Sequence, residues 1–320
     1  MDTIQQEVDE RTNLTSSNKF ELLLFRLGGD ANGDRSELFG INVFKVREIV
    51  EMPVVTAIAG SPRHILGMTN LRGQVISVID LPSVVGCNPK TGLNIMLVTE
   101  YARSTQAFAV ESVEDIVRLE WSQVMSAEGN AGSTAMVTSI VRLDGNVDST
   151  RLAQVLDVEQ ILHQITSTDI KEVDPNAAGL KLKLRPGTVI LSADDSAVAR
   201  ALIEQAFKAM NVPYIMTKTG KQGWDRLQIM AAEAEAEGKT AYDKVALVLT
   251  DLEMPEMDGF TLTRNIKNDP RFKNIPVIIH SSLSGSANEE HVKTVGADAY
   301  VAKFVALDLA NKIREVLARY

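Results

Sequence analysis

Cysteine is almost absent from this chain of 320 residues, where Cys87 is the single example. One cysteine excludes a disulfide within the chain and any metal site built from several thiolates. The chain also lacks a run of about 18 apolar residues, the length of a membrane-spanning helix. Its first residues, MDTIQQEVDERTNLTSSN, are polar and acidic. We therefore expect no secretory signal, no insertion into a membrane and a soluble, cytoplasmic protein.

Clusters of positive charge are equally scarce. The formal net charge is −9, from 33 Lys and Arg against 42 Asp and Glu, and no basic block stands out. Proteins that bind nucleic acid need such a block to neutralise phosphates, so we expect no nucleic-acid partner. The chain is 45% hydrophobic, which is enough for ordinary cores, and its length predicts two domains.

Acidic residues follow two apolar runs in the C-terminal part. Asp194 and Asp195 come after the run 189–191, and Asp251 follows the run 245–250. Acids at the carboxyl ends of parallel strands gather at one edge of a sheet. Two carboxylates about 4 Å apart repel by roughly 4 kcal/mol at an effective dielectric constant of about 20, so three together require a cation. Ligands that are all oxygen favour Mg²⁺.

Two further apolar runs end in polar groups. The run 276–280 is followed by Ser281, and a short strand expected over 296–303 ends in Lys303. The order of acid pair, single Asp, hydroxyl and lysine resembles the response-regulator receiver domain, over about residues 186–320. This resemblance implies a doubly wound, flavodoxin-like (βα)5 fold with a parallel sheet.

The receiver resemblance also implies a role for each residue. Asp251 would be the phosphoacceptor, Lys303 and Ser281 would contact the phosphoryl oxygens, and Ser281 and Tyr300 would be switch residues. The implied Mg²⁺ ligands are oxygen donors from four residues: Asp194, Asp195, Asp251 and the backbone carbonyl of Glu253. The metal ion and the Lys303 ammonium would neutralise charge that builds on the phosphoryl group during transfer.

Three positions depart from the usual receiver pattern. Phe304 replaces the proline that usually follows the lysine, which changes the expected geometry of that loop. Ser281 replaces the commoner threonine and keeps its hydroxyl. Glu253 lies where a hydrolytic water would approach the acyl phosphate. It either alters the dephosphorylation rate or is a solvent-exposed loop acid.

Short strands dominate the N-terminal part. Apolar runs such as 20–27, 74–79 and 94–99, separated by Gly, Pro and Asn, predict a sandwich or a small barrel. Helix is expected only in short stretches, such as 150–161. Because no nucleophile–base set, phosphate loop or metal cluster is visible, the residues alone indicate a β-barrel binding module.

Two stretches of this part carry a more specific signal. The sequences FGINVFKVREIV at 39–50 and GMTNLRGQVISVIDL at 67–81 resemble the signature of the CheW-like coupling domain. The resemblance covers about residues 18–165. It implies an all-β fold of two small SH3-like barrels that bridges chemoreceptors and the histidine kinase CheA.

The coupling-domain resemblance implies three partner contacts, at Val46, Glu48 and Arg72. The residues themselves leave other interpretations open. Val46 is equally consistent with core packing, and Glu48 with Arg72 could form a surface ion pair worth about 0–1 kcal/mol.

The predicted layout is a polar tail at 1–17, a coupling domain at 18–165, a linker at 166–185 and a receiver at 186–320. This combination resembles CheV-type chemotaxis proteins. It implies an adaptor recruited to receptor arrays and regulated by phosphorylation of Asp251, with no turnover of small molecules.

Two alternatives share parts of this site. The receiver could act as a phosphate sink that drains the kinase without signalling through the N-terminal domain. The sequence Asp251-Leu252-Glu253 also resembles the paired acids of haloacid-dehalogenase-like phosphatases. That family places its nucleophile after the first strand of the domain, whereas Asp251 is expected after the third.

Overall fold

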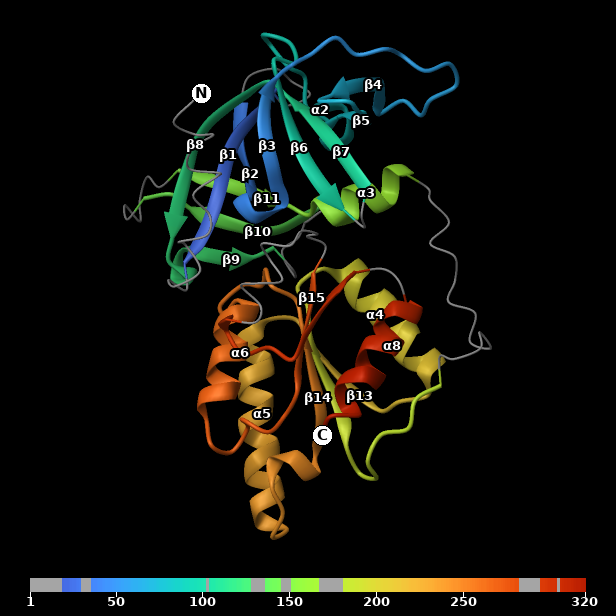
Figure 1. Ribbon diagram of the computed structural model, residues 1–320. Helices are drawn as coiled ribbons and strands as arrows, with labels where there is room; N and C mark the ends of the chain where they lie inside the picture. The colour runs from blue at the N-terminus through green and yellow to red at the C-terminus, as the bar shows by residue number, and fades with distance from the viewer. Residues whose placement is uncertain are drawn as a thin grey trace. The chain divides into compact units, whose positions relative to one another are not determined.

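The chain forms two units, Met1–Ser167 and Thr168–Tyr320, and each is described by itself (Figure 1). The computed structural model describes residues 19–29, 36–101, 104–127, 136–144, 151–166, 181–281, 294–303 and 306–320. The tail at 1–17, Phe304 and most of the linker predicted at 166–185 lie outside these residues. Within the described residues, no helix is both long and apolar enough to cross a membrane.

The first sheet of the N-terminal unit has six strands in the order β8-β1-β2-β11-β10-β9. Its neighbouring strands are antiparallel, except that β11 runs parallel to β2. The long strand β1 is buried almost throughout, because apolar clusters pack against both of its faces. The strands are β1 (Phe20–Gly29), β2 (Ser36–Asn42), β8 (Ser112–Leu119), β9 (Val124–Ser126), β10 (Val137–Arg142) and β11 (Leu152–Leu156).

The second sheet of this unit has five strands in the order β3-β6-β7-β5-β4. Val98 and Ala107 face one apolar cluster, while Leu97 and Phe108 face a second cluster that the first sheet shares. The two sheets therefore have a common core, which confirms the predicted all-β class. The strands are β3 (Val46–Glu51), β4 (Ile65–Leu71), β5 (Gln74–Asp80), β6 (Ile95–Tyr101) and β7 (Ser104–Val110). Short helices are η2 (Val43–Lys45), α2 (Leu81–Val85) and η3 (Trp121–Gln123).

The helix predicted over 150–161 is wrong in its first half, which forms β11. Residues 152–156 alternate in burial and pair with both β2 and β10, so tertiary pairing decides their conformation. The helix α3 (Val158–Thr166) begins only after Asp157, whose Oδ1 accepts a hydrogen bond from the N–H of Gln160 at 2.9 Å. Its buried face packs against the core shared by the two sheets.

The C-terminal unit confirms the predicted doubly wound α/β fold. Five parallel strands lie in the order β13-β12-β14-β15-β16. Helices α4 and α8 cover one face and α5 and α6 cover the other (Figure 1). The strands are β12 (Val189–Ala193), β13 (Tyr214–Thr217), β14 (Val245–Thr250), β15 (Val277–Ser281) and β16 (Ala299–Ala302). The helices are α4 (Ala197–Met210), α5 (Gly220–Ala236), η4 (Ala241–Asp243), α6 (Gly259–Asn268) and α8 (Ala306–Leu317).

The segment just before β12 packs against this unit. Leu182 donates its backbone N–H to the carbonyl of Met210 at 3.0 Å, and Leu182 and Leu184 join the apolar cluster between α4 and α8. The guanidinium of Arg185 lies 3.2 Å from the centre of the Tyr242 ring and donates to the Tyr242 carbonyl at 2.9 Å. These contacts fix the path by which the chain enters the sheet.

Candidate functional site

Three carboxylates meet at the carboxyl edge of the parallel sheet. Asp194 and Asp195 follow β12, and Asp251 follows β14, its neighbour in the sheet. Because Ala193 pairs with Thr250, the three acids leave the sheet side by side. Each offers one oxygen, and these oxygens all lie within 4.8 Å of one another. Asp194 and Asp251 are buried, and Asp195 is half-buried.

A buried lysine compensates part of this charge. Nζ of Lys303, which follows β16, lies 2.8 Å from Oδ2 of Asp251 and 2.9 Å from Oδ2 of Asp194. Three carboxylates and one ammonium leave an excess of negative charge in a buried place. That excess and the set of oxygen donors fit a divalent cation such as Mg²⁺. The acidic cluster is of the kind by which receiver domains bind Mg²⁺.

The phosphoacceptor candidate is held on both carboxylate oxygens. Oδ1 of Asp251 accepts a hydrogen bond from the N–H of Leu252 at 2.7 Å, and Oδ2 accepts one from Lys303. Gly259, the first residue of α6, lies too close to the backbone of Asp251 for a side chain, since a Cβ at Gly259 would lie 2.0 Å from the carbonyl oxygen of Asp251. The backbone at Asp251 is therefore fixed by glycine at the start of α6.

Ser281 and Tyr300 lie on the two strands next to this cluster. Ser281 ends β15 and is buried, and its carbonyl accepts the N–H of Lys303 at 2.9 Å. Tyr300, on β16, is half-buried against Leu252 and Phe260. The sheet thus places Ser281 on the strand next to β14, which leads into Asp251, and Tyr300 one strand further, on β16.

The loop after Asp251 carries three further acids, Glu253, Glu256 and Asp258. Glu253 is only 8% exposed, so the alternative of a solvent-exposed loop acid is wrong. Glu256 has a left-handed backbone with φ of 65°, and its Oε2 accepts a hydrogen bond from the hydroxyl of Thr219 at 3.1 Å. This bond joins the start of α5 to the loop. Sequence reasoning missed Glu256, because no side-chain pattern reveals a left-handed residue other than glycine or asparagine.

Asp258 ends the same loop and begins α6. Its Oδ1 accepts the N–H of Thr261 at 2.6 Å, which caps the helix. Burial raises the pKa of Asp258, and this effect outweighs the hydrogen bonds from Thr261 that lower it.

In the N-terminal unit, the three predicted contact residues differ in exposure. Val46 is fully buried in the shared core of the two sheets, which agrees with the core-packing interpretation of its side chain. Glu48 is mostly buried, and its Oε2 lies 2.9 Å from Nη2 of Arg72, whose side chain is 80% exposed. The ion pair considered as an alternative is therefore formed, and it presents the arginine to solvent.

Arg72 occupies an unusual place in the turn between β4 and β5. Arg72 and Gly73 both have positive φ, at 50° and 89°, as a two-residue hairpin of type I′ requires. Asn70 supports the turn by accepting the N–H of Gly73 at 2.8 Å. Asn, Asp or Gly is the usual first residue of such a turn, and arginine there costs backbone strain.

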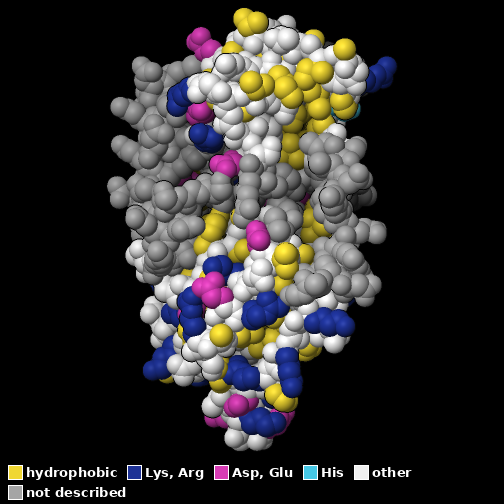
Figure 2. All heavy atoms as spheres, turned by 45° about the vertical axis from the view of Figure 1, so that its right-hand side comes forward, with side chains coloured by type: hydrophobic (Ala, Val, Ile, Leu, Met, Phe, Trp, Pro, Cys, Tyr) yellow, Lys and Arg dark blue, Asp and Glu magenta, His cyan; other side chains and the backbone are white. Residues whose placement is uncertain are grey.

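The outer side of this hairpin is apolar. Val54 is 90% exposed and Val75 is 63% exposed, and Ile58 and Met68 are also exposed. We call these four residues the hairpin patch. The segment holding Val54 and Ile58 runs beside β4, where Thr56 bridges to Met68. Apolar side chains gather on the N-terminal unit in Figure 2.

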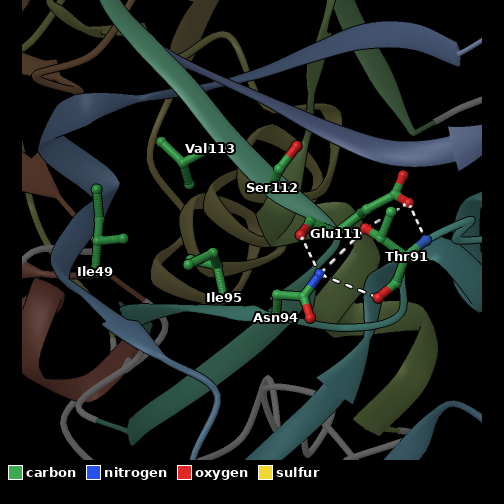
Figure 3. A pocket seen from close by; sticks show the side chains of 7 residues that line it. All are labelled: Ile49, Thr91, Asn94, Ile95, Glu111, Ser112 and Val113. Carbon is green, nitrogen blue, oxygen red and sulfur yellow. Dashed lines mark hydrogen bonds between the residues drawn. The ribbon is translucent and has the colours of Figure 1, made fainter. Parts of the chain in front are cut away.

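A cavity of about 260 Å³ lies elsewhere in the N-terminal unit. Ile49, Ile95 and Val113 give it an apolar lining, and hydrogen-bonded polar residues stand beside them (Figure 3). One carboxylate oxygen of Glu111 accepts the N–H of Thr91 at 2.6 Å and that of Lys90 at 2.7 Å.

Sequence reasoning missed this cavity, since no motif marks its lining. Burial alone would raise the pKa of Glu111, but the donors of Thr91 and Lys90 outweigh it, so the pKa of Glu111 is lowered.

Comparisons with known proteins agree with the division into two domains. Residues 21–166 match the CheW-like domain family, and residues 190–314 match the response regulator receiver domain family. The chain is 28% identical over 328 residues to chemotaxis protein CheV2 of Helicobacter pylori, covering 98% of this chain and 99% of the relative. It is 29% identical over 316 residues to chemotaxis protein CheV3 of the same organism, covering 97% of this chain and 98% of the relative.

These relatives contain both domains in one chain of nearly the same length, as this chain does. The acid cluster with its buried lysine lies in the receiver domain, and the Glu48–Arg72 pair lies in the CheW-like domain. The chain therefore belongs to the CheV-type chemotaxis proteins, in which a CheW-like domain precedes a receiver domain.

Proposed function

We propose that this chain is a chemotaxis adaptor whose CheW-like domain couples chemoreceptors to the histidine kinase CheA, and whose receiver regulates that coupling. One observation carries the proposal: the same chain joins a CheW-like domain to a receiver with a compensated acid cluster. The chain would be a cytoplasmic protein held at receptor arrays by its partners. Neither domain is expected to turn over small molecules.

The receiver would accept a phosphoryl group on Asp251. An oxygen of Asp251 forms the new P–O bond as the P–N bond of a kinase phosphohistidine breaks, and the imidazole leaves. Asp194, Asp195, Asp251 and the carbonyl of Glu253 would hold Mg²⁺, which neutralises charge on the phosphoryl oxygens. The short distance from Lys303 to Asp251 supports a second role, in which its ammonium moves onto a phosphoryl oxygen.

The phosphoryl group would be sensed by residues on β15 and β16. Ser281 would donate its hydroxyl to a phosphoryl oxygen, and the half-buried ring of Tyr300 would shift with it. The burial of Ser281 and the packing of Tyr300 against Leu252 support this coupling of site and surface. By linkage, the phosphoryl group regulates coupling only through its different affinity for the two states of the chain.

The CheW-like domain would meet its partners through β3 and the hairpin beside it. The exposed guanidinium of Arg72, held by Glu48, supplies a charged contact next to the apolar hairpin patch. Val46 would contribute indirectly: its buried side chain holds β3 against the core, and β3 carries Glu48. Such a mixed apolar and charged surface suits a protein partner better than a small ligand.

The first test is transfer of labelled phosphate from phosphorylated CheA in the presence of Mg²⁺, with Asp251→Asn as the control. Label on the wild-type chain alone supports the receiver chemistry. In a reconstituted array of receptor and kinase, Asp251→Ala should then change kinase output. Unchanged output and adaptation would refute the regulatory part of the proposal.

Two other functions are separated by simple experiments. A phosphate sink works in trans, so a chain with intact Asp251 and a substituted Arg72 would restore an array that contains the Asp251→Ala protein. Regulation within the chain predicts no such rescue. A phosphatase of haloacid-dehalogenase type would hydrolyse p-nitrophenyl phosphate. The position of Asp251 after β14, the third strand of its sheet in chain order, disfavours that family.

A further inference from the structure

Arg200 holds the backbone of the acid pair. Its Nη1 donates to the carbonyl of Asp194 at 3.0 Å and to the carbonyl of Asp195 at 2.7 Å. Arg200 lies near the start of α4, and its own N–H bonds to the carbonyl of Ser196 at 3.0 Å. The guanidinium therefore reaches back over the first turn of the helix to the two residues that follow β12. None of the motifs in the sequence singles out this arginine.

The contacts of Asp194 show how its backbone sets its carboxylate. Its N–H donates to the carbonyl of Thr217 at 3.2 Å, and its Oδ1 accepts the N–H of Ser196 at 3.0 Å. With the carbonyl held by Arg200, the residue is fixed at three points. Its Oδ2 is then directed into the cluster, 2.9 Å from Nζ of Lys303.

Asp195 depends on the same guanidinium. Its carboxylate is half-buried and lies at the edge of the cluster, and the shorter of the two bonds from Arg200 reaches its carbonyl. Since one nitrogen serves both carbonyls, the two peptide groups are fixed relative to each other. The spacing of the two carboxylates is fixed with them.

We propose that Arg200 is a positioning residue for the divalent cation, and that it acts by fixing the backbone from which Asp194 and Asp195 project. Mg²⁺ demands near-ideal octahedral geometry, so small displacements of its carboxylate ligands weaken binding. Groups that orient metal ligands typically change metal affinity about 10–100-fold when removed. The inference rests on the proposed assignment of the acid cluster as the Mg²⁺ site.

Whether the loss of Arg200 weakens or tightens Mg²⁺ binding separates a positioning role from a purely electrostatic one. A positive guanidinium close to a cation site repels the cation, so removing only its charge would tighten Mg²⁺ binding. Loss of positioning has the opposite result, because the acid pair is no longer held at the required spacing. Arg200→Met therefore weakens Mg²⁺ binding if the backbone contacts dominate.

The experiment is a calorimetric titration of the full-length protein with magnesium chloride. We expect Arg200→Met to raise the dissociation constant about tenfold. Arg200→Lys keeps the charge but replaces the planar guanidinium by a single ammonium group. It should also weaken binding, and it carries the test if Arg200→Met does not fold. Arg226→Met is the matched control, because Arg226 lies on α5 and pairs with Glu233 at 3.6 Å. Thermal unfolding without Mg²⁺ checks that each variant is folded.

A second readout uses acetyl phosphate as the phosphoryl donor. In this reaction a P–O bond of acetyl phosphate breaks, acetate leaves and a P–O bond to Asp251 forms. A positioning role predicts that Arg200→Met shifts the half-saturating Mg²⁺ concentration about tenfold and leaves the rate at saturating Mg²⁺ within about twofold of wild type. A lower rate at saturation with unchanged Mg²⁺ dependence would overturn the inference.

The outcomes also distinguish this inference from the proposed function. Tighter or unchanged Mg²⁺ binding in Arg200→Met and Arg200→Lys overturns the inference alone. A wild-type chain that binds Mg²⁺ but accepts no phosphoryl group refutes the proposed function, while the calorimetric comparison still decides the role of Arg200. A wild-type chain that binds no Mg²⁺ overturns both.

Discussion

Replacing Lys303 by methionine tests whether one buried ammonium holds the acid cluster together. Its Nζ lies 2.8 Å from Asp251 and 2.9 Å from Asp194, and all three side chains are buried. Removing one partner of a buried ion pair costs about 3–5 kcal/mol, because the remaining charge is left uncompensated. We expect the free energy of unfolding of the receiver without Mg²⁺ to fall by about this amount in Lys303→Met.

Mg²⁺ should restore much of the lost stability. A ligand that binds only the folded state adds about 2.7 kcal/mol at a concentration one hundred times its dissociation constant. In Lys303→Met no ammonium occupies the carboxylate oxygens, so the same Mg²⁺ concentration should stabilise the variant more than the wild type. A stabilisation by Mg²⁺ that is smaller in the variant would contradict this reasoning.

Urea unfolding followed by tryptophan fluorescence can measure both effects. Of the two tryptophans in the chain, Trp224 lies in the receiver and packs edge-on against Phe272, so a Trp121→Phe background isolates the receiver signal. The control is Lys312→Met, since Lys312 forms an exposed ion pair of the kind worth about 0–1 kcal/mol. A loss below about 1 kcal/mol for Lys303→Met, equal to the control, would refute a compensating role.

Three further predictions concern other parts of the chain. Glu111→Gln should cost about 1–3 kcal/mol at neutral pH. Because the folded-state pKa of Glu111 is lowered, its contribution is present above the unfolded value of about 4.3 and is lost as the pH falls through the folded value. Urea titrations between about pH 3 and pH 5 should therefore show a weaker acid dependence in Glu111→Gln. Arg72→Asn should leave the free energy of unfolding within about 1 kcal/mol of wild type, since asparagine suits the turn. It should nevertheless weaken pull-down of CheA, and undiminished binding would count against the proposed contact. Gly259→Ala should cost about 1–3 kcal/mol and slow phosphoryl transfer, because its Cβ would overlap the Asp251 carbonyl; wild-type stability in a melting experiment would contradict this.

Much of the receiver follows from local pattern. The acids at 194, 195 and 251 and the lysine at 303 each follow an apolar run, and parallel strands bring such positions to one edge of a sheet. Hydrophobic periodicity is a local property of the chain, so it can be recognised without knowledge of the fold. The same holds for the motif at 67–81, which is recognised from its local sequence alone.

Other features depended on contacts between distant residues. Residues 152–156 become a strand because β2 and β10 lie beside them, and no local preference reveals this pairing. The burial of Val46 and Glu253 also arises only when remote segments cover them. In each case the deciding free energy comes from neighbours that are far away in sequence.

The sequence by itself determined the two domain types and the acids that form the cluster, and it predicted that Lys303 lies at the same edge of the sheet. Tertiary structure alone decided that Arg200 holds the acid pair, that Glu48 pairs with Arg72, and that Arg72 has a left-handed backbone. The physical reason is that residue types and their spacing record hydrophobic periodicity and chemistry. Hydrogen bonds and ion pairs between side chains depend on distances that exist only after the chain has folded.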